Sequence, residues 1–262
     1  MTYVVDADNG LPPGIALVAG KIPGWSSVNK FGRNESVGTS YVALSEDGVY
    51  QTPQVAGAVA LRIKAGNTND TAAGSGAQAA TLQGLDETGA QVTEVLATAG
   101  TSASSATTVT WLRLYRAWVS ASGTYVAVTG ASHAADIIIE TAAGAEWAKL
   151  DGTTPGAGQT EIGCYTVPLG YKAYLTHVFM SVADANKPAE ILCQLREGIL
   201  DTSAPYSSRR TLLDLGGEEQ QAALNLEEPI PIATLTDIIF LAKAATGTPS
   251  ISVNFTVVLE AT

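Results

Sequence analysis

The chain has 262 residues, of which 46% are apolar and 15% are charged, with a formal net charge of −11. Such a chain can bury a sizeable core in one large domain or two ordinary ones. The negative charge disfavours nucleic acid as a partner, and no apolar run is long enough for a transmembrane helix, so we expect neither a nucleic-acid nor a membrane partner.

Residues 1–54 are rich in proline and glycine and show little regular alternation of apolar and polar residues. Proline removes a backbone donor, and glycine adopts dihedral angles that other residues avoid. We therefore predict an extended N-terminal arm over residues 1–54, with short edge strands at most.

Within this arm, the stretch GWSSVNKFGRNESVGTS combines aromatic, basic and amide side chains. Aromatic residues and arginine are enriched at protein–protein interfaces, and a basic segment of an acidic protein suits an acidic partner surface. We favour recognition of another protein over the alternative, in which Trp25 and Phe31 only fasten the arm to the first domain. The predicted interaction residues are Trp25, Asn29, Lys30, Phe31, Arg33 and Asn34.

Residues 55–150 contain short alternating segments that predict a first β-sandwich domain. The segment ATLQGLDETGAQVTEVLAT has two alternating runs around a glycine-bearing turn, which is typical of a β-hairpin. In TVTWLRLYRAWVSA, apolar residues interleave with Arg113, Tyr115 and Arg116, which predicts another strand. The sequence NTNDT at residues 67–71 has oxygen ligands suited to calcium, but it lacks the full acidic loop pattern, and we favour a β-turn.

Residues 151–160 are rich in glycine and threonine and predict a linker. Residues 161–262 hold seven strand candidates at regular spacing, which indicates a second antiparallel sandwich of jelly-roll type. The prediction is therefore an all-β protein with two antiparallel β-sandwich or jelly-roll-like domains and less than about a tenth helix.

Few residues have the character of a reaction centre. His133 and His177 fall in separate domains, whereas a metal site needs clustered ligands. Cys164 and Cys193 lie in apolar runs; we expect two buried thiols rather than a disulfide between neighbouring strands. The sequence therefore indicates no catalytic centre, no cofactor and no metal, and we expect that the protein is not an enzyme.

Four segments in order resemble a family of tailed-bacteriophage virion structural proteins. They are VNKFGRNESVGT, NDTAAGSGAQAATLQGLDETGAQVTEVLATAGTSA, WLRLYRAWV and YTVPLGYKAYLTHVFMSV, which together cover residues 28–183. The sequence departs from the family at PLGYKAY, where members often have PAGKTAY, and this difference alters a turn. The resemblance implies a protein made in a bacterial host cytoplasm and assembled into a virion.

The resemblance and the arm together predict a capsid decoration or cement protein, bound through its arm to the major capsid protein on the capsid exterior. Weak individual contacts favour joining several copies around a symmetry axis, so we expect a homotrimer. The alternative is a head–tail, tail or fibre component, and a receptor- or glycan-binding role belongs to this alternative. Its candidate sugar-stacking residues are Tyr165, Tyr171, Tyr174 and Tyr206.

Overall fold

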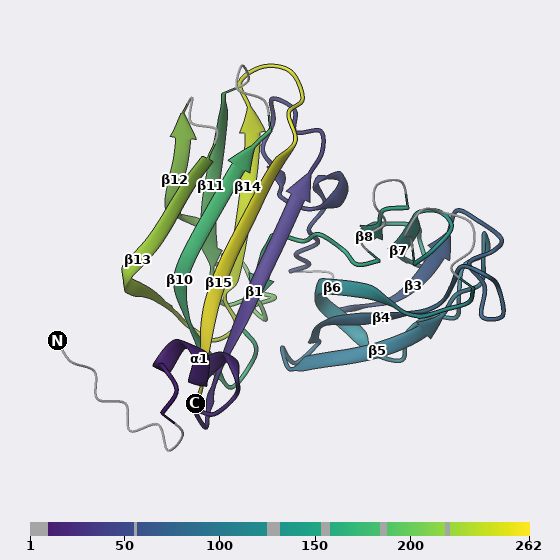
Figure 1. Cartoon of the computed structure of the whole chain (residues 1–262), viewed down its shortest axis with the longest axis horizontal. Coiled ribbons are helices and arrows are strands. Elements are labelled where there is room, and N and C mark those ends of the chain that lie inside the picture. Colours follow the sequence, from purple (N-terminus) through teal and green to yellow (C-terminus); the bar gives the residue numbers. More distant parts are fainter. Residues whose placement is uncertain (1–9, 55–56, 125–131, 153–157, 184–187, 218–220) are drawn as a thin grey trace.

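The computed structural model describes residues 10–54, 57–124, 132–152, 158–183, 188–217 and 221–262. The chain is 4% helical and 53% strand in three antiparallel sheets, which confirms the predicted all-β fold. Figure 1 shows two bodies side by side, a sandwich of two sheets and a smaller sheet domain. Among the described helices, none has the length and apolar character needed to cross a membrane.

The sandwich consists of two facing sheets. The first has the strand order β1 (Trp25–Asn34), β15 (Ile251–Ala261), β10 (Tyr171–Val182), β13 (Gln221–Ile232). The second has the order β12 (Arg210–Gly217), β11 (Ala189–Arg196), β14 (Asp237–Ala244), β2 (Val42–Ala43), and β9 (Cys164–Thr166) also pairs with β14.

The connections between these strands follow the jelly-roll pattern. The chain passes from one sheet to the other at every step except between β2 and β9, which are separated by the second body, and between β11 and β12, which are neighbours in the second sheet. The strands bury alternate residues, as in β15, where every second residue from Ile251 to Leu259 is buried. These side chains meet those of β11 and β14 in the sandwich core.

The second body is inserted between β2 and β9 of the jelly roll. It is a six-stranded sheet with the order β5 (Gln91–Ala97), β4 (Ala77–Asp86), β6 (Thr110–Ser122), β3 (Val59–Ala65), β7 (Ile137–Thr141), β8 (Glu146–Leu150). The predicted hairpin is present as β4 and β5. β3 pairs first with β6 and then with β7, so the sheet bends there around its own core.

Residues 25–43 differ from the predicted arm, because they supply β1 and β2 of the jelly roll. β1 pairs along its whole length with β15, from Trp25 opposite Glu260 to Asn34 opposite Ile251. A Cβ at Gly32 would lie 2.0 Å from the backbone nitrogen of Gly163, so this close approach requires glycine. The sequence pattern did not predict β1 because, as an edge strand, it carries polar residues on both faces. The two short helices α1 (Pro13–Val18) and η1 (Glu46–Gly48) flank β1 and β2 in the sequence.

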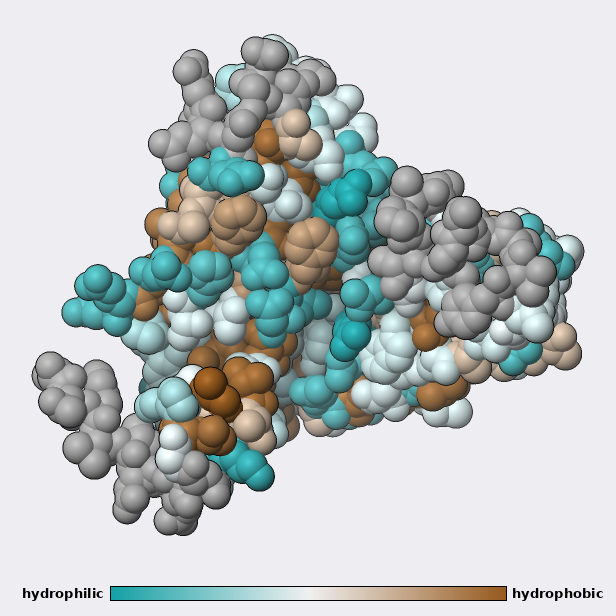
Figure 2. All heavy atoms as spheres, in the orientation of Figure 1, coloured by the Kyte–Doolittle hydropathy of each residue, from teal (hydrophilic) through white to brown (hydrophobic). Residues whose placement is uncertain are grey.

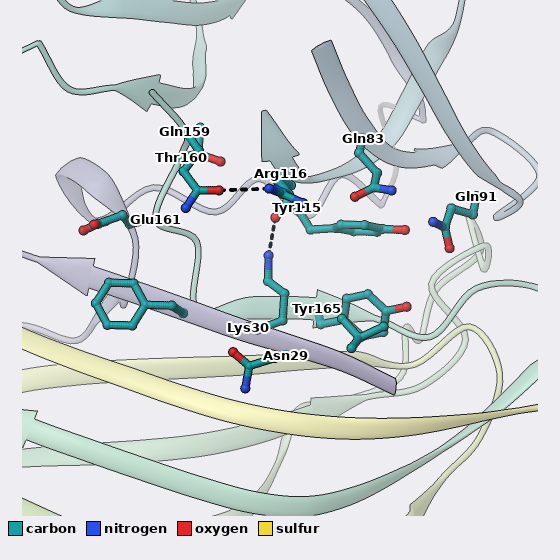
Figure 3. Close-up of a pocket in the computed structure, with 12 residues that line it drawn as sticks. Asn29, Lys30, Gln83, Gln91, Tyr115, Arg116, Gln159, Thr160, Glu161 and Tyr165 are labelled. Carbon is teal, nitrogen blue, oxygen red and sulfur yellow. Dashed lines mark hydrogen bonds between the residues drawn. The ribbon is translucent and has the colours of Figure 1, made fainter. Parts of the chain in front are cut away.

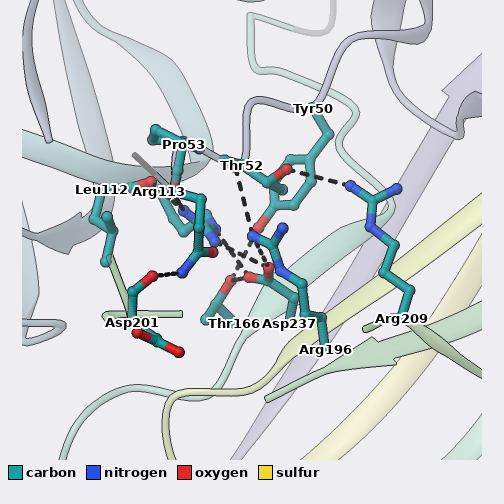
Figure 4. A network of polar contacts seen from close by, with 11 residues as sticks. Tyr50, Thr52, Pro53, Leu112, Arg113, Thr166, Arg196, Asp201, Arg209 and Asp237 are labelled. Carbon is teal, nitrogen blue, oxygen red and sulfur yellow. Dashed lines mark hydrogen bonds and ion pairs between the residues drawn. The ribbon is translucent and has the colours of Figure 1, made fainter. Parts of the chain in front are cut away.

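A buried ion pair fixes the two bodies to each other (Figure 4). Arg113 of β6 donates two hydrogen bonds, of 2.9 and 3.0 Å, to the carboxylate of Asp237 of β14, and both side chains are fully buried. Arg196 lies 3.2 Å from the same carboxylate, and the Thr166 hydroxyl donates to it at 2.7 Å. The sequence pattern placed Arg113 among the polar residues of an alternating strand and gave no sign of this burial.

Both cysteines are free and buried, which confirms the expectation of two thiols. They lie opposite successive residues of β14, Cys164 opposite Ile239 and Cys193 opposite Phe240. Because successive strand residues face opposite sides of a sheet, the two thiols belong to different core clusters. Burial raises the pKa of Cys164 to about 12, so this thiol is protonated at neutral pH.

Residues 67–71 form the predicted turn, in which the Asn67 side chain accepts a hydrogen bond from the Asn69 amide at 2.9 Å. The Asp70 carboxylate is fully buried and accepts hydrogen bonds from three backbone amides, those of Ala77 (2.8 Å), Ala134 (2.9 Å) and Ala135 (3.2 Å). Backbone donors therefore occupy the oxygens that a calcium ion would need. Within the described ranges, no group of three or more acidic, histidine or cysteine side chains is placed to hold a metal ion.

Substituting Asp70 with Ala is expected to destabilise the inserted domain by about 2–3 kcal/mol, because one buried and two partly buried backbone amides lose their acceptor. Urea unfolding measures this loss, and Thr68→Ala, which changes an exposed neighbour, is the control. Added calcium should leave the unfolding midpoint of the unsubstituted protein unchanged. A calcium-dependent rise that disappears in Asp70→Ala would instead show that residues 67–71 bind the ion.

Candidate functional site

The candidate site is β1, which divides the six predicted interaction residues between two faces. Successive residues of a strand point to opposite sides of the sheet, so odd- and even-numbered residues separate. The outer face of the first sheet carries Trp25, Asn29, Phe31 and Arg33. The opposite face carries Lys30 and Asn34, both of which are buried.

The two aromatic side chains on the outer face are partly exposed. Trp25 is 36% exposed and Phe31 is 42% exposed. The Trp25 ring stacks on Tyr174 of β10, with ring centroids 5.8 Å apart. Trp25 therefore packs on its own sheet in the jelly roll, rather than on the inserted domain, and still presents about a third of its surface to solvent.

Polar side chains continue this outer face between the aromatic residues. The Asn29 amide donates to Asn254 at 3.1 Å and to Thr256 at 3.0 Å. Further along the same row, His177 and Asn225 share a hydrogen bond of 2.8 Å. Arg33, at the far end of β1, forms an exposed ion pair with Glu35, so part of its charge is neutralised within the chain.

Helix α1 adds apolar surface beside the start of β1. Its Ile15 and Val18 are 56% and 76% exposed. Figure 1 places α1 at the end of the sandwich where β1 begins, and Figure 2 shows brown, hydrophobic atoms gathered there. We call the docking surface the set Ile15, Val18, Trp25, Asn29, Phe31 and Arg33. The sequence pattern missed the two α1 residues because it placed this segment in an irregular arm.

Lys30 does not face a partner. Its side chain is buried, and its ammonium group donates a hydrogen bond to the backbone carbonyl of Tyr115 in β6 of the inserted domain. Burial, with a smaller contribution from the positive charge of Arg116, lowers the pKa of Lys30 from 10.5 to about 7. Lys30 therefore links the two bodies. Asn34 is likewise internal, because its side-chain oxygen accepts a hydrogen bond from the Ser36 amide at 2.9 Å.

A cleft of about 320 Å³ separates β1 from the inserted sheet (Figure 3). One wall is β1, and the other is formed by β4, β5 and β6. Residues 159–161 also line it, before the chain enters β9. Side chains in its lining include Lys30, Gln83, Gln91, Tyr115, Arg116 and Tyr165.

The histidines and tyrosines singled out in the sequence lie in different places. His133 is buried, with one ring nitrogen 2.9 Å from the Ser132 hydroxyl and the other 2.9 Å from the Asp151 carbonyl oxygen. His177 lies on the outer face of the first sheet, as described above. The four tyrosines are likewise divided, since Tyr174 lies on the outer face, Tyr165 is buried beside the cleft, Tyr206 is exposed in a loop, and Tyr171 begins β10.

Comparison with known proteins identified no relative of this chain. No protein-family model matches the sequence, and no curated protein matches it.

Proposed function

We propose that this protein is a structural component of a tailed-phage particle, a decoration protein bound to the outer capsid shell through its docking surface. The observation that carries this proposal is the exposed apolar and aromatic surface at residues 15–31, which lies mostly before residue 28, where the resemblance to phage virion proteins begins. Exposed apolar groups that cluster on one surface mark interaction sites in soluble proteins. In this cluster, Val18 is 76% exposed and Ile15 is 56% exposed.

The rigidity of β1 supports this role. Trp25, Asn29 and Phe31 project from a ten-residue strand that is paired along its whole length with β15. Side chains held on a paired strand lose little conformational freedom when they bind, so more of the contact energy remains as affinity. A jelly roll that carries a rigid contact strip and a second projecting domain suits a protein that covers a shell.

We propose a homotrimer on this shell, because one small contact leaves little affinity after the entropy of association is lost. Three joined copies engage together, and the effective concentration of the second and third contacts multiplies the affinity. Light scattering of the purified protein, with and without shells, tests this part. A monomer under both conditions would contradict the trimer without affecting the docking surface.

Phe31→Ala and Trp25→Ala are each expected to weaken attachment by about 2 kcal/mol, roughly thirtyfold, as truncation of an interface hot spot does. The measurement adds purified protein to particles that lack it and quantifies bound protein after sedimentation. A copy number comparable with that of the major shell protein supports decoration, whereas a much smaller one indicates a neck, tail or fibre position.

Tyr206→Ala is the matched control. Tyr206 is 37% exposed, an exposed fraction similar to that of Trp25, and it lies outside the docking surface. It should bind particles as the unsubstituted protein does. Thermal unfolding of each variant in isolation completes the test. If Phe31→Ala and Trp25→Ala attach normally, or if they fail to attach only because they no longer unfold cooperatively, the docking surface is not the attachment site.

A further inference from the structure

The cleft between β1 and the inserted sheet has the size of a small-molecule site. Its volume of about 320 Å³ lies at the lower end of the range of about 300–1,000 Å³ that is usual for ligand pockets. It lies between two domains, a common position for such sites. A ligand of one or two rings fits this volume.

Two buried hydroxyl groups beside the cleft have no hydrogen-bond partner among the described residues. Tyr115 and Tyr165 are 3% and 1% exposed, and the hydroxyl of each makes no hydrogen bond with the part of the chain that the structure describes. Burial raises the pKa of both groups, so both are neutral and can donate as well as accept. In Figure 3 both hydroxyls point toward the side of the cleft where Gln83 and Gln91 lie.

The charged groups of the cleft, in contrast, are largely engaged within the protein. The Lys30 ammonium donates to the Tyr115 carbonyl, and Arg116 donates to the Gln159 side chain at 3.0 Å. Arg116 also lies over the ring of Trp118, 4.7 Å from its centroid. The side-chain amides of Gln83 and Gln91 show no hydrogen bond to any described residue, and neither is buried. The hydrogen-bonding capacity that is left is therefore mainly neutral, with donors and acceptors close together.

We propose that this cleft binds a neutral polyhydroxylated ligand, namely one or two sugar residues of a glycan. Sugar hydroxyls both donate and accept, as the two phenols and two primary amides of the cleft do. An anion would need an unengaged cation, and Glu161 in the lining adds a carboxyl group that opposes it. An extended peptide would need the free edge of β1, but the Arg33 amide on that edge already donates to the Glu161 carbonyl. Asn29 and Phe31 of the docking surface also line the cleft, but the site goes beyond the proposed function, since attachment to a particle uses the outer face of the first sheet.

Saturation-transfer NMR on the full chain tests the proposal with glucose, galactose and N-acetylglucosamine as probes. We expect transfer to at least one of them. The double variant Gln83→Ala/Gln91→Ala should weaken binding about tenfold, the effect of losing one or two hydrogen bonds. Gln221→Ala, which removes an exposed glutamine from β13, is the matched control and should bind normally. Transfer to methyl phosphate or trialanine in place of the sugars would overturn the proposal, as would no transfer at all or transfer that the double variant leaves unchanged.

Tyr165→Phe separates a binding role from a structural one, because it removes only the unpartnered hydroxyl. A buried hydroxyl without a partner destabilises the fold, so its removal should leave the melting temperature unchanged or raise it. A binding role predicts that sugar affinity falls in the same variant, whereas a purely structural role leaves the affinity unchanged. Unchanged affinity in Tyr165→Phe would remove this residue from the site. Particle attachment should be normal in every cleft variant, so failure of this proposal and failure of the docking surface can be told apart.

Discussion

Replacing Asp237 with Ala is expected to lower the free energy of unfolding by about 3–5 kcal/mol, because it leaves the guanidinium group of Arg113 buried without a counter-charge. Both side chains are fully buried, and the two hydrogen bonds between them measure 2.9 and 3.0 Å. The same carboxylate also accepts a hydrogen bond from Thr166 and lies 3.2 Å from Arg196. Urea unfolding at pH 7 measures the loss directly.

Two comparisons isolate the cause of this loss. Glu190→Ala breaks a solvent-accessible ion pair with Lys243, whose N–O distance of 2.8 Å is similar, and should cost much less than Asp237→Ala, because solvent screens this pair. The double substitution Arg113→Met/Asp237→Leu removes both buried charges and should recover much of the stability lost in Asp237→Ala. If Asp237→Ala costs no more than Glu190→Ala, the buried pair does not hold the two bodies together.

The sequence pattern was sufficient to predict a strand wherever one face of that strand is buried and the other is not. In β11 and β15, apolar and polar residues alternate regularly, and the structure buries every second one. The hairpin of β4 and β5 was predictable because its turn is local, with the Asp86 amide donating to the Ala90 carbonyl. β1 was not predictable in the same way, because its buried face carries Lys30 and Asn34.

The insertion of one domain into the other lies beyond local pattern. β1 pairs with β15, more than two hundred residues later, and nothing in either segment specifies that partner. The buried role of Arg113 has the same origin, since Asp237 is 124 residues away. At the candidate site, the assignment of residues 25–34 to a strand decides which side chains are exposed. Once residues 25–34 are a strand, alternation alone separates Trp25 and Phe31 from Lys30.

The buried amine of Lys30 is expected to make stability rise between pH 7 and about 10. Burial lowers its pKa from 10.5 to about 7. Between these values the lysine is neutral in the folded protein and charged in the unfolded chain, so the unfolded chain binds more protons. The free energy of unfolding then increases with pH across this range. Below pH 7 the complete cost of burying the charged amine applies. At about 1.4 kcal/mol per pKa unit, the upper limit of this effect is about 5 kcal/mol.

Glu46 has the opposite effect on the pH dependence of stability, and at lower pH. Burial, with the nearby charges of Glu161 and Asp151, raises its pKa from 4.5 to about 7. Between these values the folded protein binds more protons than the unfolded chain, so stability falls as the pH rises. The pH ranges of the two groups meet near pH 7. There the free-energy cost of burying both charged groups is at its largest. We therefore expect these two groups to produce a minimum of stability near neutral pH.

Lys30→Met should remove the rise above pH 7 and, at pH 7, raise the free energy of unfolding by about 2 kcal/mol. This net gain combines the removal of the buried amine, at most about 5 kcal/mol, with a loss of up to about 3 kcal/mol for the unpaired Tyr115 carbonyl. Glu46→Gln should flatten only the limb between pH 4.5 and 7. Lys64→Met, at an exposed position of β3, is the control and should leave both limbs unchanged. Urea unfolding at half-unit intervals of pH measures the profile. If Lys30→Met keeps the slope above pH 7, the lysine is charged in the folded protein and its burial does not set the alkaline limb.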